Sequence, residues 1–220
     1  ANTRANMPGT WSVAAAAEKY KTLYEGVRDA VGDRATVVYA KGSNLTADAE
    51  LEANATMFGR EMRDERSEQQ LLAEALSVAR SSDVIIAALG ESSEFSGESS
   101  SRSDISLPDT QRRLLEALLA TGKPVVMLNF SGRPTILSWE SEHVPAIMNV
   151  WFGGSEAADA IADVVFGDVA PSGKLTMSMP RNMGQIPMYY NHFNTGRPKQ
   201  QDVKFEKFRS GYIDSPNSPL

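Results

Sequence analysis

The chain has 220 residues, of which 41% are hydrophobic and 23% are charged, as expected for a globular protein with a substantial core. Its net charge of −6 and its pI near 5.1 argue against nucleic acids and anionic membrane surfaces as partners, because both favour basic patches. The absence of Cys excludes disulfides, thiolate chemistry and Cys-based zinc sites, and it leaves the cellular compartment open. No apolar run reaches the roughly 18 residues of a membrane span.

The N-terminal part predicts an arm, a helix and a strand. Residues 1–13 are largely polar and are expected to form an arm or linker. Apolar residues at helical spacing predict a helix over Ala14–Val31 that ends at Gly32. The β-branched run Thr36–Ala40 predicts a strand, and residues 45–66 are expected to form a charged, partly helical surface excursion.

Helices and short apolar runs then alternate along the chain. The predicted helices are Glu68–Ser81, Asp109–Thr121 with Asp109 as its cap, a segment around Pro134–Trp139, and a helix capped by Ser155 that ends at Gly167. The predicted strands are Val84–Leu89, Pro124–Asn129, Ala146–Val150 and, at an edge, Gly173–Pro180.

These strands are apolar throughout rather than alternating, so both faces of their sheet should be covered. We therefore expect an α/β fold: a three-layer sandwich whose mostly parallel sheet of about six strands is flanked by helices on both faces. The expected domain is residues 14–187, followed by an extended C-terminal tail over residues 188–220.

The most informative stretch is the polar loop that follows the apolar run 84–89. It carries Glu91, Glu94, Glu98, Arg102 and Asp104. Ligand chemistry in open α/β sheets lies beyond the carboxyl ends of the strands, which is where this loop is predicted to begin. Burial or a neighbouring carboxylate would let Glu98 act as a general acid. The alternative is a solvated acidic loop, in which Arg102 and Arg133 form ion pairs with nearby carboxylates.

Two other features have simpler explanations. Gly153-Gly154 follows a predicted strand and precedes a helix, so its amides could hold a phosphate, but neither G-x-G-x-x-G nor a Walker motif is present. A tight turn is the preferred interpretation. His143 and His192 lack a metal-ligand pattern, and neither a metal nor a cofactor is expected.

Several segments, in this order and spacing, resemble the C-terminal α/β-sandwich domain of glycoside hydrolase family 3, of the bacterial periplasmic β-glucosidase type. They are Gly90-Glu91, Gly97-Glu98-Ser99-Ser100-Ser101-Arg102-Ser103-Asp104, Leu107-Pro108, Gln111, Thr121-Gly122-Lys123-Pro124-Val125-Val126, Ser131-Gly132-Arg133-Pro134, Trp151-Phe152-Gly153-Gly154-Ser155-Glu156, Gly167-Asp168-Val169-Ala170-Pro171-Ser172-Gly173-Lys174-Leu175 and Gly184-Gln185-Ile186-Pro187. The resemblance covers nearly the whole chain.

The resemblance implies a retaining exo-β-glucosidase that removes terminal β-D-glucosyl residues from β-glucosides or oligosaccharides. In that family a barrel domain of the same polypeptide supplies the nucleophilic Asp, and the sandwich domain supplies the acid/base Glu, which corresponds to Glu98. We expect Arg102 and Asp104 to position the loop or to bind substrate. Because this chain lacks the barrel and looks like an excised piece, the fragment alone is expected to be inactive. The family also implies a periplasmic or secreted location.

Two other functions are compatible with the same residues. The first is a non-catalytic carbohydrate-binding or interaction module of the same fold. The second is a nucleotide-binding domain, which would hold a phosphate at Gly153-Gly154. The sugar is left open between glucose, xylose and related β-glycosides, since the barrel makes most sugar contacts in this family.

Overall fold

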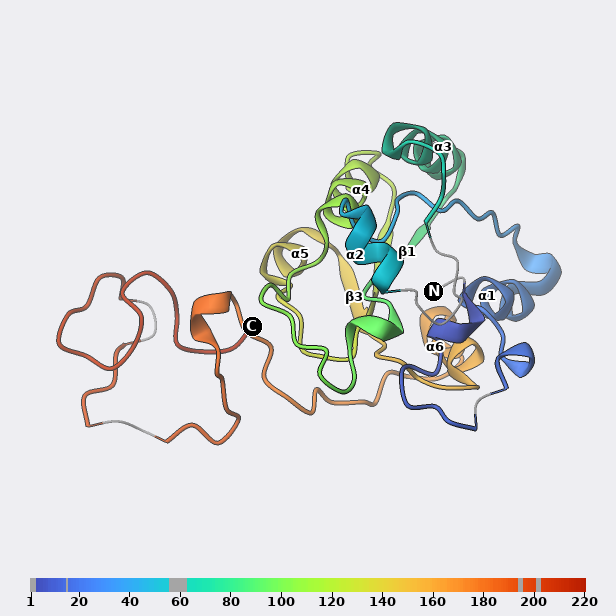
Figure 1. The fold of residues 1–220 in the computed structure, drawn as a ribbon. Helices are drawn as coiled ribbons and strands as arrows, with labels where there is room; N and C mark the ends of the chain where they lie inside the picture. Colours follow the sequence, from blue (N-terminus) through green and yellow to red (C-terminus); the bar gives the residue numbers. More distant parts are fainter. Residues whose placement is uncertain (1–2, 15, 56–62, 194–195, 201–202) are drawn as a thin grey trace.

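The computed structural model describes residues 3–14, 16–55, 63–193, 196–200 and 203–220. Its centre is a parallel sheet of strands β1 (Ile85–Gly90), β2 (Val125–Phe130) and β3 (Ala146–Asn149), in the order β1-β2-β3 (Figure 1). In the register of the sheet, Ile85 pairs with Val125 and Val126 pairs with Ala146. Parallel neighbours need a crossover, and helices supply it on both occasions.

Six α-helices surround the sheet in the described part of the chain. They are α1 (Leu23–Val31), α2 (Ala49–Asn54), α3 (Glu68–Ser81), α4 (Asp109–Leu119), α5 (Ser138–His143) and α6 (Ala157–Phe166). Short 3-10 turns are η1 (Arg4–Asn6), η2 (Ala17–Lys19), η3 (Gly32–Arg34), η4 (Ser93–Phe95) and η5 (Met183–Gln185). Ser67 begins α3 with a capping box, and Gly167 ends α6 in the left-handed conformation that favours glycine.

Alternate residues of the strands face two separate apolar cores, as predicted from strands without polar positions. On one face, Ala87 and Met127 pack with α3 and α4, and Leu115 of α4 is fully buried there. On the other face, Leu128 packs with α1 and α6. The sheet is therefore the middle layer of three, and the predicted parallel α/β fold with covered faces is confirmed.

The sheet is narrower than predicted: it has three strands in the described part of the chain, not about six. Thr36–Ala40 and Gly173–Pro180 are both described, and neither forms a strand. Val38 and Leu175 are more than half exposed, and in each segment other residues, such as Ala40 and Met179, reach the core. Apolar contacts and isolated hydrogen bonds hold these segments against the domain, but neither pairs with a neighbouring strand among the described residues. Composition does not distinguish that situation from a strand.

Helix ends are where most of the other predictions fail. The predicted helix 14–31 begins only at Leu23, because Thr22 and Glu25 form a capping box (residue 15 lies outside the described residues). Asp109 is the first residue of α4 rather than its cap, and Ser155 is not the cap of α6. The helix expected around 134–139 is displaced to Ser138–His143. Asp109 still places its charge in the first turn, where the helix dipole favours it.

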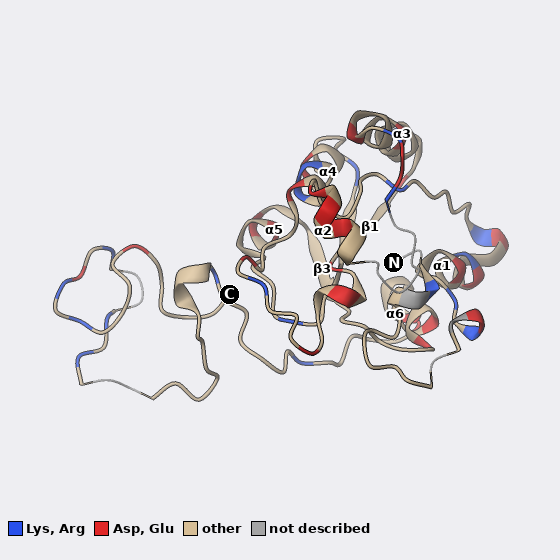
Figure 2. Ribbon diagram, viewed as in Figure 1, with Lys and Arg blue, Asp and Glu red and all other residues tan. Residues whose placement is uncertain are grey.

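The two ends of the chain differ in how they pack. Met7 of the N-terminal segment is 1% exposed and belongs to the core shared by α1 and α6. The C-terminal residues 186–220 contain no helix or strand in their described part; they loop out from the sandwich and return to it at the end, where the Leu220 N–H donates to the Met179 carbonyl at 2.8 Å (Figure 1). Lys and Arg recur along this segment, which carries five of them against three acidic residues (Figure 2). None of the described helices is long and apolar enough to cross a bilayer.

Candidate active site

The loop of interest begins at the carboxyl end of β1. Gly90 closes the strand with φ +127°, and a Cβ atom added there would lie 2.0 Å from the carbonyl oxygen of Phe130. Only glycine fits this close approach between two backbones. The buried amide of Gln111 fixes the turn, since its Oε1 accepts from the Gly90 N–H at 2.7 Å and its Nε2 donates to the Gly90 carbonyl at 2.8 Å. The next residue, Glu91, therefore leaves the sheet in a defined direction.

Glu91 is the electrostatic centre of the loop, although its side chain is only 1% exposed. Its carboxylate accepts from Arg102 Nη1 at 2.6 Å and from the Ser131 hydroxyl at 2.9 Å. Arg133 Nε lies 3.2 Å from Glu91 Oε1 and 3.3 Å from Oε2. Two guanidinium groups and a hydroxyl thus compensate the burial of this charge, as a buried carboxylate requires.

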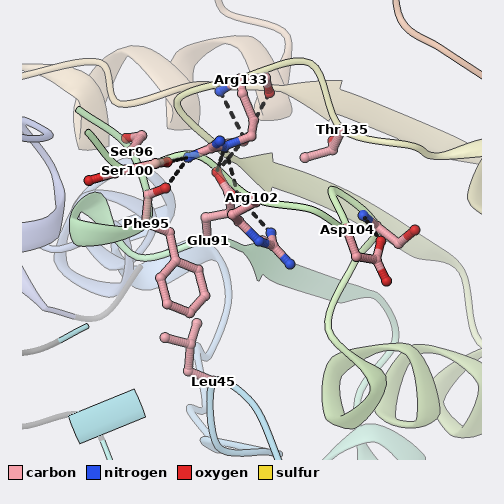
Figure 3. Close-up of polar contacts among 12 residues, drawn as sticks. Leu45, Glu91, Phe95, Ser96, Ser100, Arg102, Asp104, Arg133 and Thr135 are labelled. Carbon is pink, nitrogen blue, oxygen red and sulfur yellow. Dashed lines mark hydrogen bonds and ion pairs between the residues drawn. The ribbon is translucent and has the colours of Figure 1, made fainter. Parts of the chain in front are cut away.

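Arg133 connects this buried charge to the loop backbone (Figure 3). Its Nη2 donates to the carbonyl of Ser100 at 2.7 Å and also to the carbonyl of Phe95. These two carbonyls stand on either side of residues 96–99. One guanidinium therefore joins both ends of the turn that carries Glu98 to the carboxyl edge of the sheet.

Glu98 itself lies at the exposed tip of that turn. Its backbone carbonyl accepts from the Ser100 hydroxyl at 3.2 Å. Its carboxylate forms no hydrogen bond or ion pair with the described residues, in contrast to the buried carboxylate of Glu91. Gly97 and Ser99 flank it with φ of +111° and +56°, so the chain turns sharply and presents the side chain outward.

Arg102 and Asp104 do not contact the Glu98 carboxylate. Arg102 pairs with Glu91 and lies 5.3 Å from the centre of the Phe95 ring, at cation–π distance. Asp104 accepts from the Ser106 N–H at 2.8 Å, and this hydrogen bond, together with one from the Ser106 side chain and the nearby charge of Arg102, lowers the pKa of Asp104. Both side chains line a cavity of about 170 Å³ whose wall includes Phe95.

The ion pairs considered for Arg102 and Arg133 are present, and their shared partner is Glu91. The sequence had pointed to Glu91 only as one of five charged residues in the loop, with no role of its own. Its position directly after the strand-ending Gly90 was the available signal, because the residue after a buried strand end often starts inside the protein. Polarity alone suggested exposure for all five.

In the glycine turn at 153–154, the Gly154 amide already has a hydrogen-bond partner in the backbone of the protein. The Gly154 N–H donates to the Met7 carbonyl at 3.1 Å, and φ of +88° at Gly154 requires glycine. These observations agree with a structural turn rather than a phosphate site. In the part of the chain that the structure describes, no group of three His, Asp or Glu side chains is arranged to hold a metal ion.

Comparison with known proteins identifies the family of the chain. Residues 1–214 match the family described as the glycosyl hydrolase family 3 C-terminal domain. The chain is 44% identical over its whole length to the periplasmic beta-glucosidase of Salmonella typhimurium, of which it covers 29%. It is 37% identical to the beta-xylosidase of Formosa agariphila over 78% of this chain and 21% of that protein.

A solved structure gives the same result. The crystal structure of beta-glucosidase from Listeria innocua in complex with isofagomine superposes on the whole chain with a TM-score of 0.79 and 33% identity, and the match covers 27% of that chain. The chain thus spans less than a third of the length of these relatives. By its sequence and by its fold, the chain belongs to the C-terminal domain family of the family 3 glycosyl hydrolases.

Proposed function

We propose that this chain is the C-terminal part of a retaining exo-β-glucosidase and that Glu98 is its acid/base residue. One observation carries the proposal: the Glu98 side chain is exposed at the tip of a turn, while Arg133 is bound both to the buried Glu91 carboxylate and to the backbone of that turn. An acid/base group must reach the substrate from a fixed position, and this arrangement supplies both properties.

The chemistry needs a second carboxylate, which we assign to a barrel domain of the same polypeptide. In the first step the Glu98 carboxyl group gives its proton to the glycosidic oxygen as the C1–O bond breaks and the second carboxylate bonds to C1. In the second step ionised Glu98 takes a proton from water as the water oxygen attacks C1 and releases that carboxylate. The chain alone, with only the first of these groups, is expected to be inactive.

Arg102 and Asp104 are proposed as positioning residues of the loop rather than as acid/base groups. Arg102 binds Glu91 and so fixes the part of the loop that follows Glu98. Asp104 accepts a hydrogen bond from the backbone N–H of Ser106 and so fixes the turn between these two residues. Asp104 also lines the cavity beside Phe95, so it is the candidate for a contact with the leaving group of the substrate.

A chimera tests the proposal, with this chain replacing the matching segment of the Salmonella typhimurium relative. With an aryl β-glucoside that has a poor leaving group as substrate, Glu98→Gln should lower kcat/KM by about 10²-fold or more, as expected for loss of general acid/base catalysis. Sodium azide should restore part of the turnover of Glu98→Ala, because an anionic nucleophile needs no general base. Glu116→Gln, an exposed change on α4, is the matched control and should leave the rate unchanged.

The alternative remains a non-catalytic carbohydrate-binding or interaction module of the same fold. An active chimera in which Glu98→Gln has no effect would favour that module and reject the catalytic proposal. Aryl β-xylosides should be assayed in parallel with β-glucosides, because one relative is a beta-xylosidase. Glucosides come first, since the relative that matches the whole chain is a beta-glucosidase.

The location and the division of the chain belong to the same proposal. We propose a periplasmic or secreted enzyme, supported by the name of the Salmonella typhimurium relative. Fractionation of the native cells, with activity followed in each fraction, tests this. We also propose residues 1–13 as an N-terminal arm whose Met7 packs into the domain core, residues 14–187 as the sandwich domain and residues 188–220 as its tail. Limited proteolysis should then cut first beyond residue 187.

A further inference from the structure

The turn that carries Glu98 is attached to the rest of the protein on two sides, by Arg133 and by the N-terminal segment. We propose that Arg133, anchored on buried Glu91, and the two N-terminal residues Asn6 and Thr10 are positioning residues that set the place of Glu98 before substrate binds. This inference rests on the proposed function of Glu98, and it assigns a role to residues outside the loop itself.

The first side of the attachment runs from the sheet through Arg133. Glu91 is tied to β2 by its backbone, since its N–H donates to the Phe130 carbonyl at 2.7 Å. Its carboxylate binds Arg133 Nε, and the same guanidinium then donates to the carbonyls of Phe95 and Ser100 (Figure 3). Because both carbonyls are held by one planar group, the two ends of the turn cannot separate without breaking a charge-assisted hydrogen bond.

The second side of the attachment is the N-terminal segment. Asn6 is buried, and its Oδ1 accepts from the N–H of Ser93 at 2.9 Å and from the Ser93 hydroxyl at 2.8 Å. Thr10 donates to the carbonyl of Ser96 at 3.3 Å. The segment between them is fixed in turn, because Met7 is buried in the core. Residues more than 80 positions away in the sequence thus support the start of the turn.

The close packing of the turn shows why this support is needed. A Cβ atom added at Gly97 would lie 2.6 Å from Thr10 Oγ1, so the segment and the turn are in direct contact. Ser99 has φ +56°, a conformation that costs a non-glycine residue on the order of 1 kcal/mol and persists only where its surroundings impose it. An unsupported turn would relax from this conformation, and Glu98 would move with it.

Positioning matters here because proton transfer needs the acid within hydrogen-bond reach of the glycosidic oxygen. A displacement of roughly 1 Å at a reacting group can lower a rate by about 10²-fold. Glu98 has no side-chain partner of its own among the described residues, so its position is set by the backbone of its turn. The groups that hold this backbone therefore act on catalysis through Glu98.

The first experiment measures the turn directly in the 220-residue chain. Arg133→Lys keeps the positive charge but cannot reach Glu91 and two carbonyls at once, because a lysine has no planar fork of donors. Amide hydrogen exchange in residues 96–102 should be at least tenfold faster in Arg133→Lys and faster, by less, in Thr10→Val. Arg113→Lys, an exposed change on α4, is the control and should leave this exchange unchanged.

The second experiment uses the active chimera and separates positioning from general stability. Arg133→Lys should lower kcat/KM, which reports the first step, by about 10-fold or more on a β-glucoside with a poor leaving group. With a 2,4-dinitrophenyl glucoside, whose leaving group needs little protonation, the loss of kcat/KM should be much smaller. An equal loss on both substrates, or unchanged exchange in residues 96–102, would overturn the inference.

The two proposals fail in different ways. If Glu98→Gln is fully active, the acid/base role is wrong, and the positioning role falls with it. If Glu98→Gln is inactive while Arg133→Lys and Thr10→Val keep the dependence on leaving group of the parent chimera, only the positioning role is wrong. Thr10→Val removes one hydroxyl from a partly buried surface site, so it keeps the test open if Arg133→Lys does not fold.

Discussion

Arg133 and Glu91 form an ion pair of 3.2 Å in which the carboxylate side chain is 1% exposed and the guanidinium side chain is 18% exposed. Arg133 joins the pair to the turn that carries Glu98 through the carbonyls of Phe95 and Ser100. The two glutamates of this acidic loop, seven positions apart, therefore differ in environment: Glu91 is buried and holds the loop, whereas Glu98 is exposed to solvent.

The first prediction concerns the loss of the buried carboxylate. Glu91→Ala leaves Arg102 and Arg133 without their shared counter-charge, and breaking a buried pair from one side costs on the order of 3–5 kcal/mol. The free energy of unfolding, measured with urea, should fall by about that amount. Glu116→Ala removes an exposed glutamate from α4 and should change it by less than about 0.5 kcal/mol.

The second prediction is that Glu98 contributes nothing to folding. Its side chain is exposed and has no partner among the described residues, so Glu98→Gln should keep the unfolding free energy within about 0.5 kcal/mol of the parent chain. The urea midpoint of the isolated chain is the measurement. A clear loss of stability would mean that Glu98 takes part in the packing of the loop, and it would weaken the case for a group kept available for substrate.

A third prediction compares two glycines that both have positive φ. At Gly90 an added Cβ would lie 2.0 Å from the Phe130 carbonyl oxygen, whereas at Gly122 (φ +74°) nothing lies within 4 Å. Gly122→Ala should therefore cost only the backbone strain, about 1–2 kcal/mol. Gly90→Ala must also displace the neighbouring strand and should cost about 3 kcal/mol or more, measured by thermal unfolding. Equal costs would show that the strand yields easily.

The fourth prediction concerns pH. Hydrogen bonds from Ser106 and the nearby charge of Arg102 lower the pKa of Asp104 in the folded chain. A depressed folded pKa gives stability that is present above the unfolded value, near 3.9, and is lost as the pH falls through the folded pKa. Asp104→Asn should therefore lower the urea midpoint at pH 7, and its difference from the parent should shrink below about pH 4.

Asp83→Asn is the matched control for this pH dependence. Asp83 is exposed and has no hydrogen bond or ion pair among the described residues. Its substitution should leave the urea midpoint close to that of the parent chain at both pH values. If the two Asp variants behave alike, the contact between Asp104 and Ser106 does not stabilise the fold.

The layered fold could be predicted because its determinants are local. The run from Val84 to Leu89 has no polar position, which a strand covered on both faces requires, and strand β1 lies within one residue of it. The helix over Glu68–Ser81 was predicted to the residue, because Ser67 and Gln70 form a capping box at its start. The extended segment at 36–40 could not be distinguished from a strand, since a ladder depends on a neighbour that is distant in sequence.

The site was predictable in part for the same reason. The place of the loop follows from a strand that ends in a glycine and is followed by a polar stretch, whereas the acid/base role of Glu98 comes from the resemblance to the family and stays a proposal. The contacts of Arg133 with Phe95 and Ser100 join residues more than 30 positions apart, and those of Asn6 with Ser93 join residues 87 apart. No local pattern encodes such pairs, because they form only when the sheet has brought the segments together.

The buried N-terminal segment has a practical consequence for domain shuffling. A cut placed just before residue 14 would look harmless in the sequence, yet it would withdraw Met7 from the interior and strip Asn6 and Thr10 from their partners. Fusion junctions and expression boundaries should therefore lie upstream of Thr3, where η1 begins to form. In a hybrid joined further downstream, the turn that carries Glu98 would lose its hydrogen bonds to Asn6 and Thr10.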